Sequence, residues 1–204
     1  MIPKSPKSNQ EFQKKKMRVV LLPGMGCTPV ARSNWYSWFA TEMKKRPYCD
    51  EFILRDFPDP YQCKESIWMD FVQETIGLDD MTVIVGHSSG AACAMRLLEQ
   101  HNKHPLLGCV LVAACYTDLG DDCERRSGYF NRPWDWTKMK SGAQEIVFFH
   151  SDDDHLIPVK EARYIAEQMK GSNFEYHEME GKSHFFSPWP DLLDVMDQKF
   201  GGST

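Results

Sequence analysis

Short apolar segments recur along the chain and are separated by longer segments with helical periodicity. The apolar segments are rich in β-branched and aromatic residues and predict strands at residues 18–22, 51–55, 82–85, 109–112, 146–149 and 174–178. We expect the first four strands to be buried on both faces, which is the situation of strands in a parallel sheet.

The segments with helical periodicity predict helices at residues 35–45, 65–75, 90–100, 159–169 and 192–200. Asn34 precedes the first of them and is a residue type that caps helix N-termini. Strands that alternate with helices predict an α/β fold, with a mostly parallel sheet of about six strands flanked by helices in three layers.

The length of 204 residues fits one α/β domain over residues 17–200, followed by a C-terminal tail at 201–204. Residues 1–16 carry five lysines and one glutamate, and we expect them to form a flexible basic extension. The rest of the chain has 19 basic and 28 acidic residues, a net charge of −9. A body of that sign repels phosphate backbones, so we expect no nucleic-acid partner.

No apolar run approaches the ~20 residues of a membrane helix, and the N-terminus lacks the apolar core of a signal peptide. The seven cysteines are odd in number and include no C-x-x-C pair, which favours neither a disulfide framework nor a zinc site. We therefore expect a cytoplasmic protein without membrane association, metal or cofactor.

The motif Gly-His-Ser-Ser-Gly at residues 86–90 lies between a predicted strand and a predicted helix. G-x-S-x-G in this setting is typical of the nucleophile elbow of α/β-hydrolases, in which a sharp turn presents the serine at the carboxyl edge of the sheet. Gly86 and Gly90 permit the close backbone approach that such a turn requires. The pattern therefore indicates Ser88 as a nucleophile.

A serine nucleophile needs an acid and a histidine base, which follow it in that order in this fold. The loop after the fifth predicted strand holds Asp152, Asp153 and Asp154. We take Asp154 as the acid because it lies four positions before Pro158, while Asp152 and Asp153 compete for that role or cap the turn. His184 follows the last predicted strand and is the candidate base.

Three other histidines lie near these motifs. His87 adjoins the nucleophile and cannot easily turn its ring onto Ser88. His155 directly follows the acid, and His177 lies within the last predicted strand. We therefore expect none of the three to act as the base.

The oxyanion that forms during attack on a carbonyl requires two backbone N–H donors. We expect one from Ser89, directly after the nucleophile, and the other from Met25 in the Pro-Gly-Met-Gly loop at residues 23–26. An ordinary glycine-rich turn is the alternative for this loop. A dinucleotide-binding loop is excluded, because the third glycine of G-x-G-x-x-G is Pro29 here.

An aromatic cluster follows the fourth predicted strand and includes Tyr129, Phe130, Trp134 and Trp136. Aromatic side chains wall many small-molecule pockets, so Tyr129, Phe130 and Trp134 are candidates for a substrate pocket. Packing of this loop onto the edge of the sheet is the alternative, since aromatic residues are common in cores.

Several motifs together resemble the retinoblastoma-binding protein 9 family of small serine hydrolases. They are the elbow at 86–90, SGYFNRPWDW at 127–136, ESIW at 65–68, the glycine loop at 23–26 followed by Asn-Trp-Tyr at 34–36, and Pro-Asp-Pro at 58–60. The similarity extends over about residues 17–200. It implies a compact α/β-hydrolase fold without a large lid domain, with the nucleophile, acid and base on Ser88, Asp154 and His184.

The family's namesake carries a Leu-x-Cys-x-Glu motif before the elbow strand, whereas residues 76–80 here are Ile-Gly-Leu-Asp-Asp. Binding to the retinoblastoma protein is therefore not expected. We predict a serine hydrolase that cleaves small carboxylic esters or amides. The alternatives are a protein-interaction module that keeps the hydrolase fold without significant turnover, and acyl transfer to an alcohol or amine.

Overall fold

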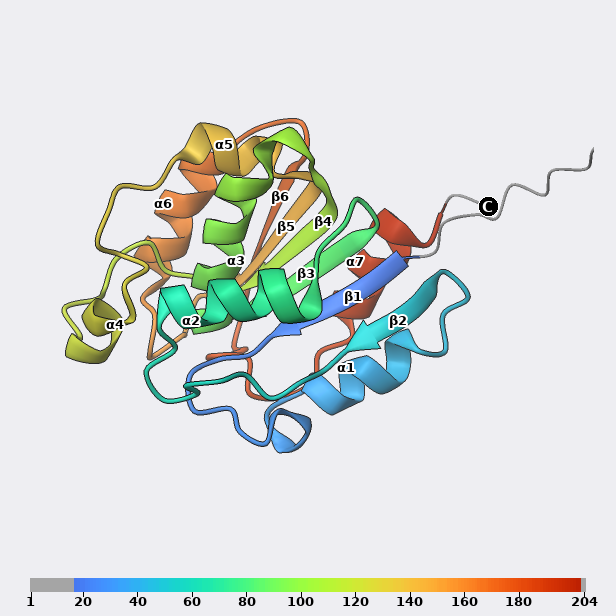
Figure 1. Ribbon diagram of the computed structural model, residues 1–204, viewed down its shortest axis with the longest axis horizontal. Helices are drawn as coiled ribbons and strands as arrows, with labels where there is room; N and C mark the ends of the chain where they lie inside the picture. The colour runs from blue at the N-terminus through green and yellow to red at the C-terminus, as the bar shows by residue number, and fades with distance from the viewer. Residues whose placement is uncertain (1–16, 203–204) are drawn as a thin grey trace, which may run out of the picture.

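The fold is built on a six-stranded parallel sheet, described over residues 17–202 of a computed structural model (Figure 1). The expected basic extension at residues 1–16 lies outside the described residues, as do 203 and 204. The sheet has the strand order β2-β1-β3-β4-β5-β6, and each neighbouring pair is parallel. Its strands are β1 (Met17–Leu22), β2 (Cys49–Ile53), β3 (Thr82–His87), β4 (Leu106–Val112), β5 (Ala143–Ser151) and β6 (Phe174–Met179).

The five predicted helices are present with small shifts at their ends. They are α1 (Tyr36–Met43), α2 (Glu65–Asp70), α3 (Ser89–Gln100), α6 (Val159–Met169) and α7 (Asp191–Phe200). A π-helical segment at Phe71–Ile76 continues α2, and short 3₁₀ turns lie at Val30–Arg32 and His101–Lys103. No helix within residues 17–202 combines the length and apolar character needed to cross a bilayer.

The expected cap at Asn34 is wrong. Asn34 adopts a left-handed conformation with φ 44°, and the N-cap of α1 is Trp35, which offers no side-chain hydrogen bond. The Asn34 side-chain amide instead lies 3.2 Å from the Tyr36 hydroxyl. The Asn34 side chain therefore hydrogen-bonds beside the glycine loop and does not cap the helix.

Two further short helices, α4 (Asp122–Ser127) and α5 (Trp136–Ser141), were not predicted. Each spans six residues, which is too short for an amphipathic repeat to show in the sequence. Their capping residues are clear in the structure: Asp121 accepts hydrogen bonds from two amides at the start of α4, and Asp135 accepts one from Lys138. Gly128, with φ 96°, ends α4.

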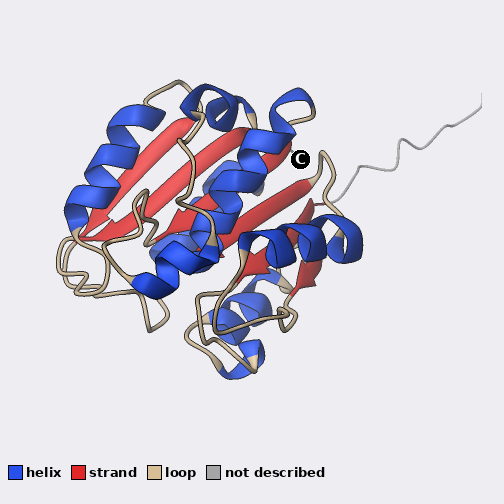
Figure 2. Ribbon diagram, turned by 60° about the vertical axis from the view of Figure 1, so that its left-hand side comes forward, coloured by secondary structure: helices blue, strands red, loops and turns tan. Residues whose placement is uncertain are grey.

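Helices cover both faces of the sheet and make the three layers (Figure 2). Alternate residues of each strand point to opposite faces. Val20, Leu22 and Ile84 belong to the core formed with α2, α3, α5 and α6. Val19 and Val83 belong to a second core formed with α1 and α7. The short apolar runs in the sequence therefore mark strands that are buried on both sides.

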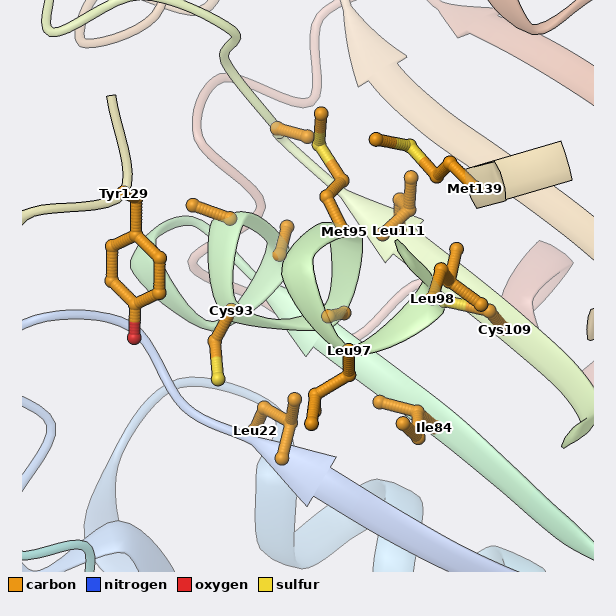
Figure 3. Packing of buried hydrophobic residues seen from close by; sticks show 14 of the residues in the cluster. Leu22, Ile84, Cys93, Met95, Leu97, Leu98, Cys109, Leu111, Tyr129 and Met139 are labelled. Atoms are coloured by element: carbon orange, nitrogen blue, oxygen red, sulfur yellow. The ribbon is translucent and has the colours of Figure 1, made fainter. Parts of the chain in front are cut away.

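Helix α3 packs on the sheet within the first core, against strand residues such as Leu22, Ile84 and Leu111 and beside Met139 of α5 (Figure 3). Its residues from Ser89 to Leu98 are all buried, including the small Ala91, Ala92 and Ala94. Small side chains on this helix allow it to pack closely on the sheet, directly behind the turn that follows β3.

Candidate active site

The turn between β3 and α3 places Ser88 in a conformation that few residues adopt. Ser88 has φ 56° and ψ −120°, and it is the N-cap of α3. A Cβ on Gly86 would lie 2.5 Å from the carbonyl oxygen of Gly90, and a Cβ on Gly90 would lie 2.1 Å from that of Leu22. Both glycines are therefore required for the turn, which holds Ser88 in a strained conformation at the carboxyl edge of the sheet.

Asp154 and His184 form a buried hydrogen-bonded pair at the same edge. Nδ1 of His184 lies 2.8 Å from Oδ2 of Asp154, and the two residues are 4% and 7% exposed. A carboxylate only accepts, so Nδ1 carries the proton and Nε2 is left as the basic nitrogen. The histidine is thereby held in the tautomer that a general base requires.

Asp154 is held as a carboxylate by its surroundings. Its Oδ1 accepts hydrogen bonds from the amides of Leu156 and Ile157, both at 2.9 Å. Burial opposes ionisation, but the hydrogen bond from His184 and these two amides outweigh it and hold the pKa of Asp154 below its usual range. The negative charge beside His184 is therefore present throughout the neutral pH range.

The two preceding aspartates hold the loop that carries His184. Asp152 accepts a hydrogen bond from the Gly181 amide at 3.1 Å, and Asp153 accepts one from the Ser183 amide at 2.7 Å. The structure therefore separates the three competing carboxylates, since only Asp154 contacts the imidazole. Within residues 17–202, no group of three or more His, Cys, Asp and Glu side chains is arranged to hold a metal ion.

One pocket of about 560 Å³ brings the separated motifs together. Ser88 and His184 line it together with Met25, and its volume is in the range of small-molecule sites. Its remaining walls come from the glycine loop, the elbow, the segment around α4 and the loops after β5 and β6: Gly24, Cys27, Asn34, His87, Leu119, Asp121, Cys123, Glu124, Leu156, Ile157 and Phe186.

The wall around α4 was missed in the sequence. Burial, with the nearby charge of Asp121 as a second cause, raises the pKa of Glu124. The signal for this element was present, because Asp121 is an N-cap residue and Gly128 stands at the other end of the helix. Asp121 and Glu124 both line the pocket, so one of its sides carries carboxyl groups.

The glycine loop leaves the Met25 amide available. Gly24 donates its N–H to the Tyr36 hydroxyl at 2.9 Å, and Gly26 donates to the Pro60 carbonyl at 2.7 Å. Among the described residues, the N–H of Met25 between them has no acceptor. Ser89 is the first residue of α3, where the N–H has no partner within the helix. Both expected oxyanion donors thus have free hydrogen-bonding capacity.

The three aromatic candidates for the substrate pocket do not line the pocket that contains Ser88. Tyr129 is fully buried in the core beside α3 (Figure 3). Phe130 and Trp134 line a separate hollow of about 420 Å³ together with Tyr116. The alternative was that this loop packs onto the edge of the sheet; the aromatic side chains are packing residues, but they pack against the core around α3.

Arg96 of α3 explains why the aromatic loop faces inward. Its guanidinium is buried and donates hydrogen bonds to the carbonyl oxygens of Tyr129 at 3.1 Å, Arg132 at 2.9 Å and Pro133 at 3.2 Å. It also lies 3.6 Å from the centre of the Trp134 ring. The segment SGYFNRPW therefore folds around one buried cation, which is a structural role.

The chain is similar to known serine hydrolases. A family model described as serine hydrolase matches residues 19–198. The serine hydrolase RBBP9 of Rattus norvegicus is 38% identical over 168 residues, which cover 82% of this chain and 87% of the rat protein. The solved structure of the ydeN gene product from Bacillus subtilis has a TM-score of 0.78 at 22% identity and covers 91% of this chain and 100% of that one.

At 22% identity the ydeN structure shows a shared fold alone, and the same holds for more distant structures. The esterase RhEst1 from Rhodococcus sp. superposes with a TM-score of 0.63 at 13% identity, covering 92% of this chain and 91% of the esterase. The parallel sheet, the elbow after β3 and the serine hydrolase match agree with one another, and the described residues form no lid domain. The chain therefore belongs to the family of small, RBBP9-like serine hydrolases with the α/β-hydrolase fold.

Proposed function

We propose that this hydrolase cleaves small carboxylic esters or amides through a triad of Ser88, His184 and Asp154. The observation that carries the proposal is the buried hydrogen bond of 2.8 Å between Asp154 and His184, at a pocket that Ser88 also lines. The same three residues follow from chain order and from the family resemblance. The strained backbone of Ser88 supports its role as the nucleophile.

In this mechanism Oγ of Ser88 attacks the carbonyl carbon while Nε2 of His184 takes the hydroxyl proton. Asp154 keeps the imidazole oriented and stabilises the imidazolium that forms. The tetrahedral intermediate then breaks its bond to the leaving group, which receives the proton from His184. Water attacks the acyl-enzyme with the same base, and the acid product leaves with Ser88 restored.

The negative oxygen of the tetrahedral intermediate would be held by the amides of Met25 and Ser89. Both are free of other partners in the described structure, as a preorganised oxyanion hole requires. Removing one such donor in known enzymes costs about 3 kcal/mol of transition-state stabilisation.

The size of the pocket supports small substrates. Leu119, Leu156 and Phe186 provide apolar surface on one side, while Asp121 and Glu124 provide acidic surface. The volume of about 560 Å³ suits a ligand of a few tens of atoms or fewer. Substrate identity is best approached with a panel of p-nitrophenyl esters and aminoacyl amides.

A reducing compartment such as the cytoplasm is also part of the proposal. All seven cysteines lie within the described residues as free thiols, and four of them are buried. Free buried thiols are typical of proteins that fold where disulfides do not form.

A fluorophosphonate probe tests the nucleophile directly, because it forms a covalent bond only with an activated serine. We expect labelling of the wild-type protein and of Ser66→Ala, which removes an exposed hydroxyl on α2. Ser88→Ala should be unlabelled and should lose turnover on the panel. Absence of wild-type labelling and turnover, or equal labelling of Ser88→Ala, would refute the assignment.

A further inference from the structure

The second residue of the elbow motif, His87, is buried and takes no step in the mechanism above. It ends β3, and its side chain is 1% exposed. Its Nδ1 lies 2.7 Å from the Tyr36 hydroxyl, and its Nε2 lies 2.9 Å from the main-chain carbonyl oxygen of His184. A buried ring with partners on two other segments of the site is in a position to hold those segments together.

The chemistry of the partners fixes the direction of each hydrogen bond. A carbonyl oxygen only accepts, so Nε2 of His87 carries the proton and donates it to His184. Nδ1 is then the acceptor and receives the single hydroxyl proton of Tyr36. The Tyr36 oxygen in turn accepts the Gly24 amide at 2.9 Å and the Asn34 side-chain amide at 3.2 Å. One chain of hydrogen bonds thus runs from Gly24 through Tyr36 and His87 to His184.

Each segment in this chain adjoins an atom of the proposed reaction. Gly24 directly precedes Met25, the proposed oxyanion donor, and His87 directly precedes Ser88. The carbonyl that accepts from His87 belongs to His184, the proposed base. The loops after β1, β3 and β6 are therefore connected through one imidazole, although they are far apart in the sequence.

The imidazole of His87 is suited to this role only when it is neutral. Burial, and secondarily the nearby charge of His184, lowers the pKa of His87 to about 3. The ring centres of His87 and His184 are 5.0 Å apart. A proton on His87 would take away the acceptor for Tyr36 and would set a second cation beside the imidazolium that forms on His184.

We propose that His87 is a positioning residue, which orients the main chain of His184 and, through Tyr36, the loop that carries Met25. The inference rests on the proposed function, because it assigns His184 and Met25 their roles in the reaction. Misplacement of the base and of an oxyanion donor affects the transition state more than the bound substrate. Loss of His87 or of the Tyr36 hydroxyl should therefore lower kcat and leave KM nearly unchanged.

Substitutions at His87 separate the two hydrogen bonds of its ring, the one to the His184 carbonyl and the one from the Tyr36 hydroxyl. His87→Gln places an amide near the position of Nε2 and keeps a donor for the His184 carbonyl. His87→Asn places its amide near the position of Nδ1 and keeps only a partner for the Tyr36 hydroxyl. His87→Leu removes both.

Tyrosine variants test the same series of hydrogen bonds at Tyr36. Tyr36→Phe keeps the buried ring and removes only the hydroxyl. Tyr48→Phe is the matched control, because it removes a hydrogen-bonded hydroxyl just before β2, at the opposite edge of the sheet. Each variant is compared with the wild-type protein by melting temperature, kcat and KM on one ester.

We expect His87→Leu, His87→Asn and Tyr36→Phe to lose about 100-fold in kcat with KM within about threefold. His87→Gln should recover only part of kcat, because it keeps the donor to the His184 carbonyl and loses the partner of the Tyr36 hydroxyl. Tyr48→Phe should match the wild type. Folded His87→Asn and Tyr36→Phe proteins with wild-type kcat, or a loss expressed in KM alone, would overturn the inference. If His87→Leu does not fold, those two variants decide the question.

The same measurements distinguish a failure of this inference from a failure of the proposed function. Turnover that disappears in Ser88→Ala but is unchanged in Tyr36→Phe and His87→Asn contradicts the positioning role alone. Turnover that persists in Ser88→Ala contradicts the mechanism on which that role depends.

Discussion

Acidification should destabilise this protein through His87, even above the range in which carboxylates titrate. The side chain is buried with both ring nitrogens hydrogen-bonded, and its pKa falls from 6.5 to about 3. Below pH 6.5 the unfolded chain binds a proton at this histidine and the folded protein does not. The contribution of His87 to the free energy of unfolding is therefore fully present above about pH 6.5 and is lost as the pH falls toward 3.

The size of the effect follows from the pKa difference. Each pKa unit corresponds to about 1.4 kcal/mol, so the full difference amounts to about 5 kcal/mol. At pH 5 the free energy of unfolding falls by about 2 kcal/mol, because pH 5 lies about 1.5 units below the ordinary histidine pKa of 6.5. Typical domains are stable by about 5–15 kcal/mol, so a change of this size is measurable.

Urea unfolding of the wild type and of His87→Gln at pH 8 and pH 5 measures this contribution. The wild type should lose about 2 kcal/mol more than the variant between these pH values, because only the wild type carries an imidazole at position 87, whereas the other histidines, such as the buried His150, are common to both proteins. Asp154 does not interfere, since its pKa is lowered and its contribution is lost only in more acidic solution. Parallel losses in the two proteins would refute the reasoning.

Three further predictions concern the elbow, the acid and the aromatic loop. Gly90→Ala should lower the free energy of unfolding by about 3 kcal/mol, because its Cβ would lie 2.1 Å from the Leu22 carbonyl oxygen; Gly171→Ala, with ordinary contacts, is the control in thermal unfolding. Asp154→Asn should reduce kcat about 10⁴-fold while the protein remains folded, and a loss no larger than that of Asp152→Asn would remove the distinction between these carboxylates. Arg96→Met should cost about 3 kcal/mol in urea unfolding, because the carbonyls of the aromatic loop lose their donor. Equal stability of Arg96→Met and the exposed Arg132→Met would contradict that explanation.

The strands and the elbow could be predicted from the sequence, because the residue types within each short segment determine them. Strands buried on both faces must be apolar at nearly every position, which is why the runs around Val20, Ile84 and Val110 stand out. The elbow depends on two backbone approaches that exclude any side chain at Gly86 and Gly90. The pair of Asp154 and His184 also follows, since chain order and the sheet edge bring the two loops together.

Features that depend on contacts between residues far apart in the sequence could not be predicted from such local patterns. The aromatic loop turns inward because Arg96, some thirty residues earlier in the chain, binds three of its carbonyls. Nothing in the local pattern of Tyr129 or Phe130 distinguishes a core residue from a pocket wall. His87 is a similar case, because its partners Tyr36 and His184 lie 51 and 97 positions away.

The sequence predicted one continuous helix over residues 65–75. The structure has α2 ending at Asp70 and a π-helical segment to Ile76, after which Gly77, with φ 71°, ends the helix. Amphipathic periodicity does not separate these two helical forms over so few residues. The short α4 escaped prediction for a related reason, and with it the acidic wall of the pocket.

The most direct test of the mechanism is to identify the acylated residue during turnover. Wild-type protein is quenched while it hydrolyses p-nitrophenyl acetate and is analysed by peptide mass spectrometry. The mechanism predicts an acetyl group on Ser88, and it predicts neither this adduct nor turnover in Ser88→Ala. Turnover that continues in Ser88→Ala, or acetylation confined to another nucleophile of the pocket such as Cys27, would contradict it.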